Sequence, residues 1–135
     1  MNGRFPIALH ILTLLSKTGN ELMSSDYIAG SININPALAR KEISNLRNLG
    51  LISSKEGKSG GYVLAKPATQ ITLADVYQAV KNQPVLGVAK NTPNPDCLVG
   101  KQINKKLDEL YDDLDKTLLK KLSSITIEDF ANKFE

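Results

Sequence analysis

The side chains best suited to bind a polyanion are clustered in the middle of this 135-residue chain. Residues 40–66 hold six lysines and arginines against two acidic residues. Residues 1–66 carry eight basic and four acidic residues, whereas residues 67–135 carry nine and ten. Guanidinium and ammonium groups bind phosphate oxygens, and they also donate hydrogen bonds to guanine in the DNA major groove. The pattern indicates a nucleic-acid-binding half, although a solvated helix face would carry the same charges.

Cys97 and His10 are the only cysteine and the only histidine of the chain. A single cysteine excludes an intrachain disulfide framework and an all-cysteine metal site. One histidine argues against a histidine-based hydrolytic centre. We therefore expect no catalytic residues, no metal and no cofactor, and we expect that the protein is not an enzyme.

Three helices are predicted within the first 50 residues. Residues 7–15 are apolar at nearly every position, which is typical of a buried helix. A second helix is expected over residues 24–31, with Ser24 as its N-cap. Asn35 and Pro36 provide a third start signal, because an N-cap is followed by proline at the first helical position.

The third helix is expected over residues 37–49, with Gly50 as its C-cap. Its apolar residues form one stripe, and Arg40, Lys41 and Arg47 fall largely outside it. The small residue Ala37 lies near the start of the exposed face, where it would let the backbone approach a groove.

The pattern then changes to that of a β-hairpin. Residues 51–54 and 62–65 are predicted strands, and the glycine-rich residues 56–61 are the turn between them. Lys55 and Lys58 make the tip basic. This hairpin would be a wing with a loose, positively charged end.

The second half contains a loop and the longest helix. A capping box at 72–75 opens a short helix that ends near Val80. Residues 82–96 are expected to be a loop, and Asn94-Pro95 is expected to open a helix that ends near Leu122. Thr126 caps a last helix that ends at Phe134. The apolar seam of the long helix consists of Ile103, Leu107, Leu110, Leu114 and Leu118.

Cys97 is the one candidate for switching chemistry. If Asn94 is the cap, Cys97 occupies the third helical position, where the helix N-terminus favours a thiolate and Asp96 opposes it. Oxidant would convert the thiol to a sulfenic acid, a mixed disulfide or an intersubunit bridge. The alternative is a small buried hydrophobe that closes the loop onto the helix.

The order of elements predicts a mainly α fold with a small β-hairpin, a winged helix-turn-helix followed by a long C-terminal helix. Residues 1–81 would be the DNA-binding domain, 82–94 a connecting loop, and 95–135 the long helix with its short successor. The third helix of such a fold enters the major groove, and the hairpin tip reaches phosphates or the minor groove. The predicted DNA contacts are Ser24, Asn35, Pro36, Ala37, Arg40, Lys41, Arg47, Lys55, Lys58, Ser59, Gly60, Gly61 and Tyr62.

Four stretches resemble the Rrf2 family of bacterial transcription regulators. They are Gly3-Arg4-Phe5, LRNLGLI at 46–52, GGYVL at 60–64 and ITLADV at 71–76. The resemblance covers essentially the whole chain and adds Arg4 to the expected DNA contacts. It implies a homodimer joined through the long helix, so that 95–135 is the dimerisation segment. It also implies a palindromic operator read by two wings and two recognition helices.

The chain departs from this family at two positions. Members that bind an iron–sulfur cluster have three cysteines before the long helix, but residues 80–100 offer only Cys97. We therefore expect no cluster. Many relatives have an arginine just before the first wing glycine, and this chain has Glu56 there. Lys55 or Lys58 would then contact the DNA backbone, and the wing would position the protein more than read sequence.

The resulting hypothesis is a cytoplasmic, DNA-binding transcription regulator, a homodimeric repressor with a candidate redox switch at Cys97. No apolar run approaches 18 residues, so no membrane span is expected. The alternative is a winged-helix module that acts through a partner protein or senses a small ligand, with the loop 82–96 covering a pocket. Steeply salt-dependent DNA affinity would favour the first hypothesis.

Overall fold

The computed structural model describes residues 3–58 and 60–135. Its elements follow the predicted order: α1 (Arg4–Thr18), α2 (Ser25–Ile32), α3 (Pro36–Asn48), β1 (Ile52–Lys55), β2 (Gly61–Leu64), a 3₁₀ turn (Ala68–Gln70), α4 (Leu73–Val80), α5 (Ile103–Ser123) and α6 (Ile127–Ala131). The mainly helical chain with one antiparallel hairpin confirms the predicted fold class. Ser59, a predicted wing contact, lies outside the described residues.

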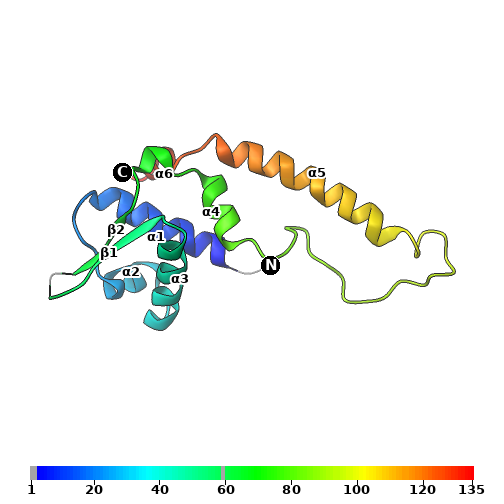
Figure 1. Cartoon of the computed structure of the whole chain (residues 1–135), viewed down its shortest axis with the longest axis horizontal. Coiled ribbons are helices and arrows are strands. Elements are labelled where there is room, and N and C mark those ends of the chain that lie inside the picture. Colours follow the sequence, from blue (N-terminus) through cyan, green and yellow to red (C-terminus); the bar gives the residue numbers. More distant parts are fainter. Residues whose placement is uncertain (1–2, 59) are drawn as a thin grey trace.

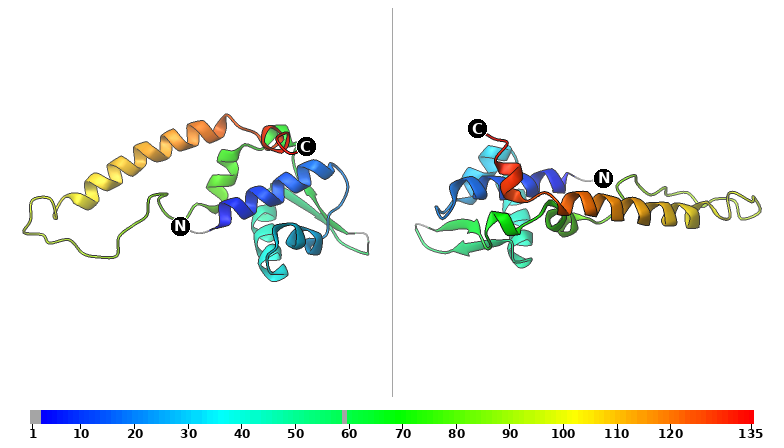
Figure 2. Two further views of the ribbon diagram at one scale, coloured as in Figure 1. Left: turned by 180° about the vertical axis from the view of Figure 1, so that it is seen from behind. Right: turned by 90° about the horizontal axis from the view of Figure 1, so that it is seen from above.

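The molecule consists of a body and an arm. Figure 1 shows α1, α2, α3, the hairpin, α4 and α6 gathered together, whereas α5 projects away from them. The loop after α4 runs outward to the far end of α5, and α6 brings the chain back to the body beside α1. The additional views in Figure 2 show the same separation of arm and body.

Helix α1 lies at the centre of the core. Its side chains at Ile11, Leu12 and Leu15 have no solvent exposure. Leu46 of α3, Val76 of α4 and Ile127 of α6 are equally inaccessible and belong to the same apolar cluster. A helix that is apolar on almost every side is stable only when other elements surround it, which is the position that α1 occupies.

Local hydrogen bonds begin the helices where the sequence predicts. The Ser24 hydroxyl oxygen accepts a bond from Tyr27 N, which caps α2. Asn35 Oδ1 accepts from Ala37 N at 2.7 Å, and Pro36 takes the first position of α3. These side chains satisfy backbone donors that the first helical turn leaves unpaired.

Two capping boxes lie side by side where α4 and α6 begin. Thr72 with Asp75 and Thr126 with Asp129 each exchange the paired bonds of this motif. Thr72 and Thr126 also form an isolated antiparallel bridge. The C-terminal helix is therefore attached by its backbone to the segment that follows the wing.

The hairpin pairs Ile52 with Leu64 and Lys55 with Gly61. The strands lie one residue away from the predicted 51–54 and 62–65, and Gly61, which was predicted to end the turn, is the first residue of β2. On its outer side β2 pairs with Met23, since each backbone N–H of Met23 and Tyr62 donates to the carbonyl of the other. This bridge attaches the wing to the segment just before α2.

The two wing glycines occupy positions where backbone segments approach closely. A Cβ added to Gly61 would lie 2.8 Å from the carbonyl oxygen of Met23. A Cβ at Gly60 would meet the carbonyl oxygen of Lys55. Backbone atoms cannot move aside as a flexible side chain does, so the Gly60-Gly61 pair is required by the hairpin itself.

The start of the long helix was predicted incorrectly. Asn94 does not cap α5; its side chain accepts from Asp96 N at 2.9 Å, and the chain continues through turns until α5 begins at Ile103. Gly100 lowers the helix propensity of this segment. Leu98 is 70% exposed, so no buried apolar contact offsets that cost.

The last helix also ends earlier than predicted, at Ala131 rather than Phe134. After Ala131 the chain continues as a turn, in which Phe134 N donates to the Ala131 carbonyl. The Phe134 carbonyl accepts a hydrogen bond from Lys17 Nζ of α1 at 2.7 Å. The chain end is therefore held against α1 by a side-chain hydrogen bond and not by a further turn of α6.

We predict that Gly61→Ala lowers the free energy of unfolding by about 1–3 kcal/mol, because overpacking against backbone costs this much. Gly30→Ala is the matched control. Nothing lies within 4 Å of a Cβ there, and alanine in a helix should stabilise by roughly 0.5–1 kcal/mol. Urea denaturation of both variants measures the difference. Equal stabilities for the two variants would contradict the close approach at Gly61.

Candidate nucleic-acid interface

Helix α3 separates into a buried face and a basic exposed face. Ala39, Ile43 and Leu46 are at most 1% exposed and pack inward. Arg40 and Lys41 are exposed on the other side. In Figure 1, α3 projects from the lower side of the body, away from α6. This geometry leaves the basic face of the helix accessible to a groove of double-stranded DNA.

The first turn of α3 offers small and polar groups. Asn35, Pro36 and Ala37 are all exposed. Because Asn35 Oδ1 already accepts from Ala37 N, the side-chain amide NH₂ is the group that can contact a base edge or a phosphate. The short side chain of Ala37 allows close approach of this turn.

Arg47 lies between α3 and the hairpin. Its guanidinium donates to the Ser54 hydroxyl of β1 and to the Ser44 hydroxyl, both at 3.4 Å. The side chain is exposed, so these long bonds direct the cation without removing it from solvent. The structure therefore places Arg47 at the junction of helix and wing.

The wing presents exposed lysines, and its glycines have internal roles. Lys55 and Lys58 are both exposed. The N–H of Gly60, a predicted DNA contact, donates to the Gly57 carbonyl at 3.0 Å. Tyr62, also a predicted DNA contact, is half-buried and packs against the core.

Arg4 forms an ion pair inside the fold. Its Nε lies 3.1 and 3.2 Å from the two carboxylate oxygens of Glu42, which is 2% exposed. A buried carboxylate is costly unless a cation compensates it, so this pair joins α1 to the inner face of α3. Sequence reasoning did not reveal this role of Arg4, because Glu42 reads as one more exposed helix residue until α1 is packed against it.

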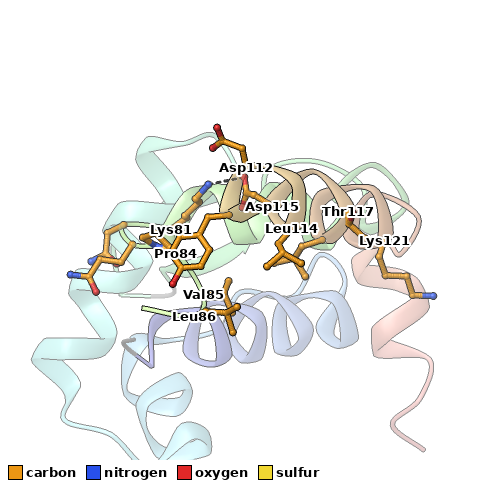
Figure 3. A pocket seen from close by; sticks show the side chains of 13 residues that line it. Lys81, Pro84, Val85, Leu86, Asp112, Leu114, Asp115, Thr117 and Lys121 are labelled. Carbon is orange, nitrogen blue, oxygen red and sulfur yellow. Dashed lines mark hydrogen bonds and ion pairs between the residues drawn. The ribbon is translucent and has the colours of Figure 1, made fainter. Parts of the chain in front are cut away.

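A cavity of about 630 Å³ lies between α5 and the loop that follows α4. Figure 3 shows Pro84, Val85 and Leu86 from the loop facing Leu114 and Thr117 from α5. Lys81, Asp112 and Lys121 add charged groups at its wall. The loop 82–96 was expected to cover a pocket at this junction, and the cavity lies there.

Tyr77, Lys81 and Asp115 form a polar cluster beside the cavity that sequence reasoning did not find. The Tyr77 hydroxyl donates to Asp115 Oδ1 at 2.8 Å, and Lys81 Nζ donates to Oδ2 at 2.7 Å. Burial, with the hydrogen bond to Asp115 and its charge, raises the pKa of Tyr77 to about 12. The hydrogen bonds from Lys81 and Tyr77 lower the pKa of Asp115. The carboxylate is thus held ionised between α4 and α5.

Cys97 is exposed and lies in the turns before α5. The expectation that it occupies the third position of the long helix is therefore wrong. The alternative of a buried hydrophobe is also wrong, since the side chain is open to solvent. An exposed thiol is accessible to oxidants and to a second thiol.

The predicted seam of α5 is not covered within one chain. No residue of α5 is buried; Leu110 is 50% exposed and Leu114 is 43% exposed. Ile103, Leu107 and Leu118 are partly exposed on the same helix. An apolar row of this length is unusual on the surface of a monomer.

The described residues contain no group of three histidine, cysteine or acidic side chains arranged to hold a metal ion. His10 Nε2 lies 3.0 Å from the Ser31 hydroxyl oxygen, so the imidazole of α1 is hydrogen-bonded to α2. Across residues 3–58 and 60–135, no helix has the length and apolar character needed to cross a membrane.

Comparisons with known protein sequences match nearly the whole chain. The model of the Rrf2 family, described as an iron-dependent transcriptional regulator, matches residues 1–133. YwnA of Bacillus subtilis (strain 168), named as an HTH-type transcriptional regulator, is 37% identical over 98% of this chain and 97% of its own length.

Solved structures show the same arrangement. A crystal structure described as a DNA binding protein is 32% identical, with a TM-score of 0.73 over 95% of this chain and 98% of its own. The structure of CymR, described as the global cysteine regulator of B. subtilis, is 26% identical. Its TM-score is 0.70 over 100% of this chain and 98% of its own. The described residues do not fit the iron of the family description: His10 lies on α1, Cys97 lies in the turns before α5, and no cluster of histidine, cysteine and acidic side chains could hold the ion.

Proposed function

Because the chain belongs to the Rrf2 family of transcriptional regulators, we propose that it acts as a homodimeric repressor that binds a palindromic operator. The protein is a DNA-binding transcription regulator and not an enzyme. Its site of action would be the cytoplasm, where bacterial chromosomal DNA lies. A dimer bound over a promoter blocks access of RNA polymerase, which is the simplest route to repression.

The exposed basic face of α3 carries this proposal. Arg40 and Lys41 stand out from a helix whose other face is fixed in the core. A helix held in this way can enter the major groove with its side chains toward base edges. Asn35, Pro36 and Ala37 would lie at the groove as its first turn.

The remaining predicted contacts would position the protein on the backbone. Lys55 and Lys58 of the wing are exposed cations, and so is Arg47, which is hydrogen-bonded to Ser54 of β1. Ser24 would offer a phosphate its hydroxyl hydrogen and the N-terminal end of α2. Arg4, Gly60, Gly61 and Tyr62 hold structural positions described above, so any DNA contact by them would be secondary.

The dimer would form through α5. Its uncovered leucines would be buried by the same helix of a second copy, and burial of apolar surface stabilises such contacts by about 25 cal/mol per Å². A twofold dimer presents the same α3 twice, which matches an operator with inverted half-sites.

The cavity favours a second candidate function, the sensing of a small molecule. Its volume of about 630 Å³ falls in the range of ligand sites, and apolar residues line it with a few charged groups. A ligand there would contact both α5 and the loop after α4.

We predict that Arg40→Ala weakens binding to the operator by about 1–3 kcal/mol with little effect on random DNA, because base contacts supply discrimination.

We predict that Lys58→Ala weakens binding to the operator and to random DNA alike, because its contact is to phosphate. The slope of log affinity against log salt concentration should fall by roughly one unit per subunit. Lys133→Ala, on the C-terminal turn, is the control. Fluorescence anisotropy at several salt concentrations measures all three. Equal losses on both duplexes for Arg40→Ala would reassign Arg40 to phosphate, and no salt-dependent DNA binding by the unmodified protein would favour a protein-interaction module.

We predict that Leu110→Asp shifts the protein from dimer to monomer, because the substitution would bury a carboxylate in the apolar seam. Lys116→Asp is the control, since this position lies on the opposite side of α5 from Leu114. Sedimentation equilibrium of both variants gives the oligomeric state. If both variants dimerise with equal affinity, Leu110 does not lie in the dimer interface.

We predict that peroxide changes operator affinity through Cys97, because the thiol is exposed and can form a sulfenic acid or an intersubunit disulfide. Cys97→Ser should bind the operator with the affinity of the reduced unmodified protein, and peroxide should not change that affinity. Anisotropy before and after peroxide, with non-reducing electrophoresis, measures the effect. The same response in both proteins would exclude a thiol switch.

A further inference from the structure

One carboxylate on the arm receives two hydrogen bonds from the body. Asp115 of α5 accepts from the hydroxyl of Tyr77, on α4, and from Nζ of Lys81, the C-cap residue that follows α4. The Lys81 ammonium also lies 5.8 Å from the centre of the Tyr77 ring. Figure 3 shows Lys81 and Asp115 joined beside the cavity. We call Tyr77, Lys81 and Asp115 the clamp.

The clamp is linked to α3, the proposed recognition helix, through α1 and α4. Tyr77 is 8% exposed, and its ring meets Phe5 of α1 edge-on at 6.4 Å. Asn45 of α3 donates through Nδ2 to the carbonyl of Ala79, on α4, at 3.4 Å. Because α4 and α3 both pack on α1, and one hydrogen bond joins them directly, a group attached to α4 moves with the DNA-binding surface.

Within the described part of the chain, α4 is the element of the body that α5 contacts most. No residue of α5 is buried, and its C-terminal end is anchored to the core by Leu122, by Ile125 and by the α6 helix that follows. That anchor lies two helical turns after Asp115. A helix anchored at one end can still change its angle to the body unless a second contact fixes it. The clamp is the hydrogen-bonded part of the contact between α4 and α5, and together with the C-terminal anchor it sets the angle of α5 to the body that carries α3.

From this geometry we propose that Tyr77, Lys81 and Asp115 are positioning residues that set the half-site spacing the protein recognises. The inference rests on the proposed dimer. In a twofold dimer joined through α5, the angle between α5 and α3 decides how far apart the two α3 helices lie. They must match major grooves about 34–36 Å apart or a multiple of that distance. If the angle between α5 and α3 changes, the two α3 helices fit half-sites that are separated by a different number of base pairs.

The test selects operators with half-sites separated by spacers that differ in steps of one base pair. The unmodified protein and Asp113→Asn, the same change on α5 outside the clamp, should enrich one spacer length. Tyr77→Phe removes only the hydroxyl and Asp115→Asn removes only the charge. Each should reduce the preference for that spacer over its neighbours by about tenfold. Affinity for a single half-site duplex should stay unchanged, because α3 itself is intact.

A charge reversal supplies the rescue. Lys81→Asp alone should broaden the spacer preference, and the combination Lys81→Asp with Asp115→Lys should narrow it again by re-forming the ion pair. Failure of this rescue in a folded dimer would overturn the positioning role.

Two results distinguish this inference from the proposed function. If all clamp variants keep the native spacer preference and lose only thermal stability, the clamp is merely structural and the inference is wrong. If the unmodified protein selects no paired half-sites or is monomeric, the proposed function fails and the inference falls with it.

Discussion

The burial of α1 is the constraint on which the rest of the structure depends. Its completely buried side chains at Ile11, Leu12 and Leu15 are covered by residues of α3, α4 and α6 together. Because interiors are close-packed, each of these helices can present only one face inward. The orientation of α3 follows: with Ile43 and Leu46 held in the core, Lys41 lies on the opposite side and faces solvent, and Arg40 is exposed at the flank of the buried face.

The same core leaves α5 without enough contacts of its own. In this body α6 packs against α1, whereas α5 contacts α4 and no residue of it is buried. The bridge between Thr72 and Thr126 closes that arrangement. The arm is therefore left with an exposed apolar row, which is a poor arrangement for a monomer in water and a good one for association.

Helix α4 joins these two parts. It packs on the core with one face, through residues such as Val76 and Tyr77. With its C-terminal half it reaches Asn45 of α3 and Asp115 of α5. A short helix in this place can transmit the position of one neighbour to the other, since a packed core resists continuous deformation.

The sequence by itself determined the features that arise between neighbouring residues. These are the caps at Ser24 and Asn35, the capping box at 72–75, the glycine-rich turn, and the basic face of α3. Each depends on hydrogen bonds or periodicity within about one helical turn, so the residue types suffice to predict it. The order of these parts followed from the same patterns, and the family resemblance added the expected dimer and its operator.

Only the tertiary structure decided what depends on distant segments. The pairing of Arg4 with Glu42 requires α1 to lie against α3, and the contact of Tyr77 with Asp115 spans 38 residues. The start of α5 was mispredicted at Asn94-Pro95, because a local cap signal cannot show that no buried contact supports the helix before Ile103. Such interactions join residues that only packing brings together, and no short pattern in the chain records them.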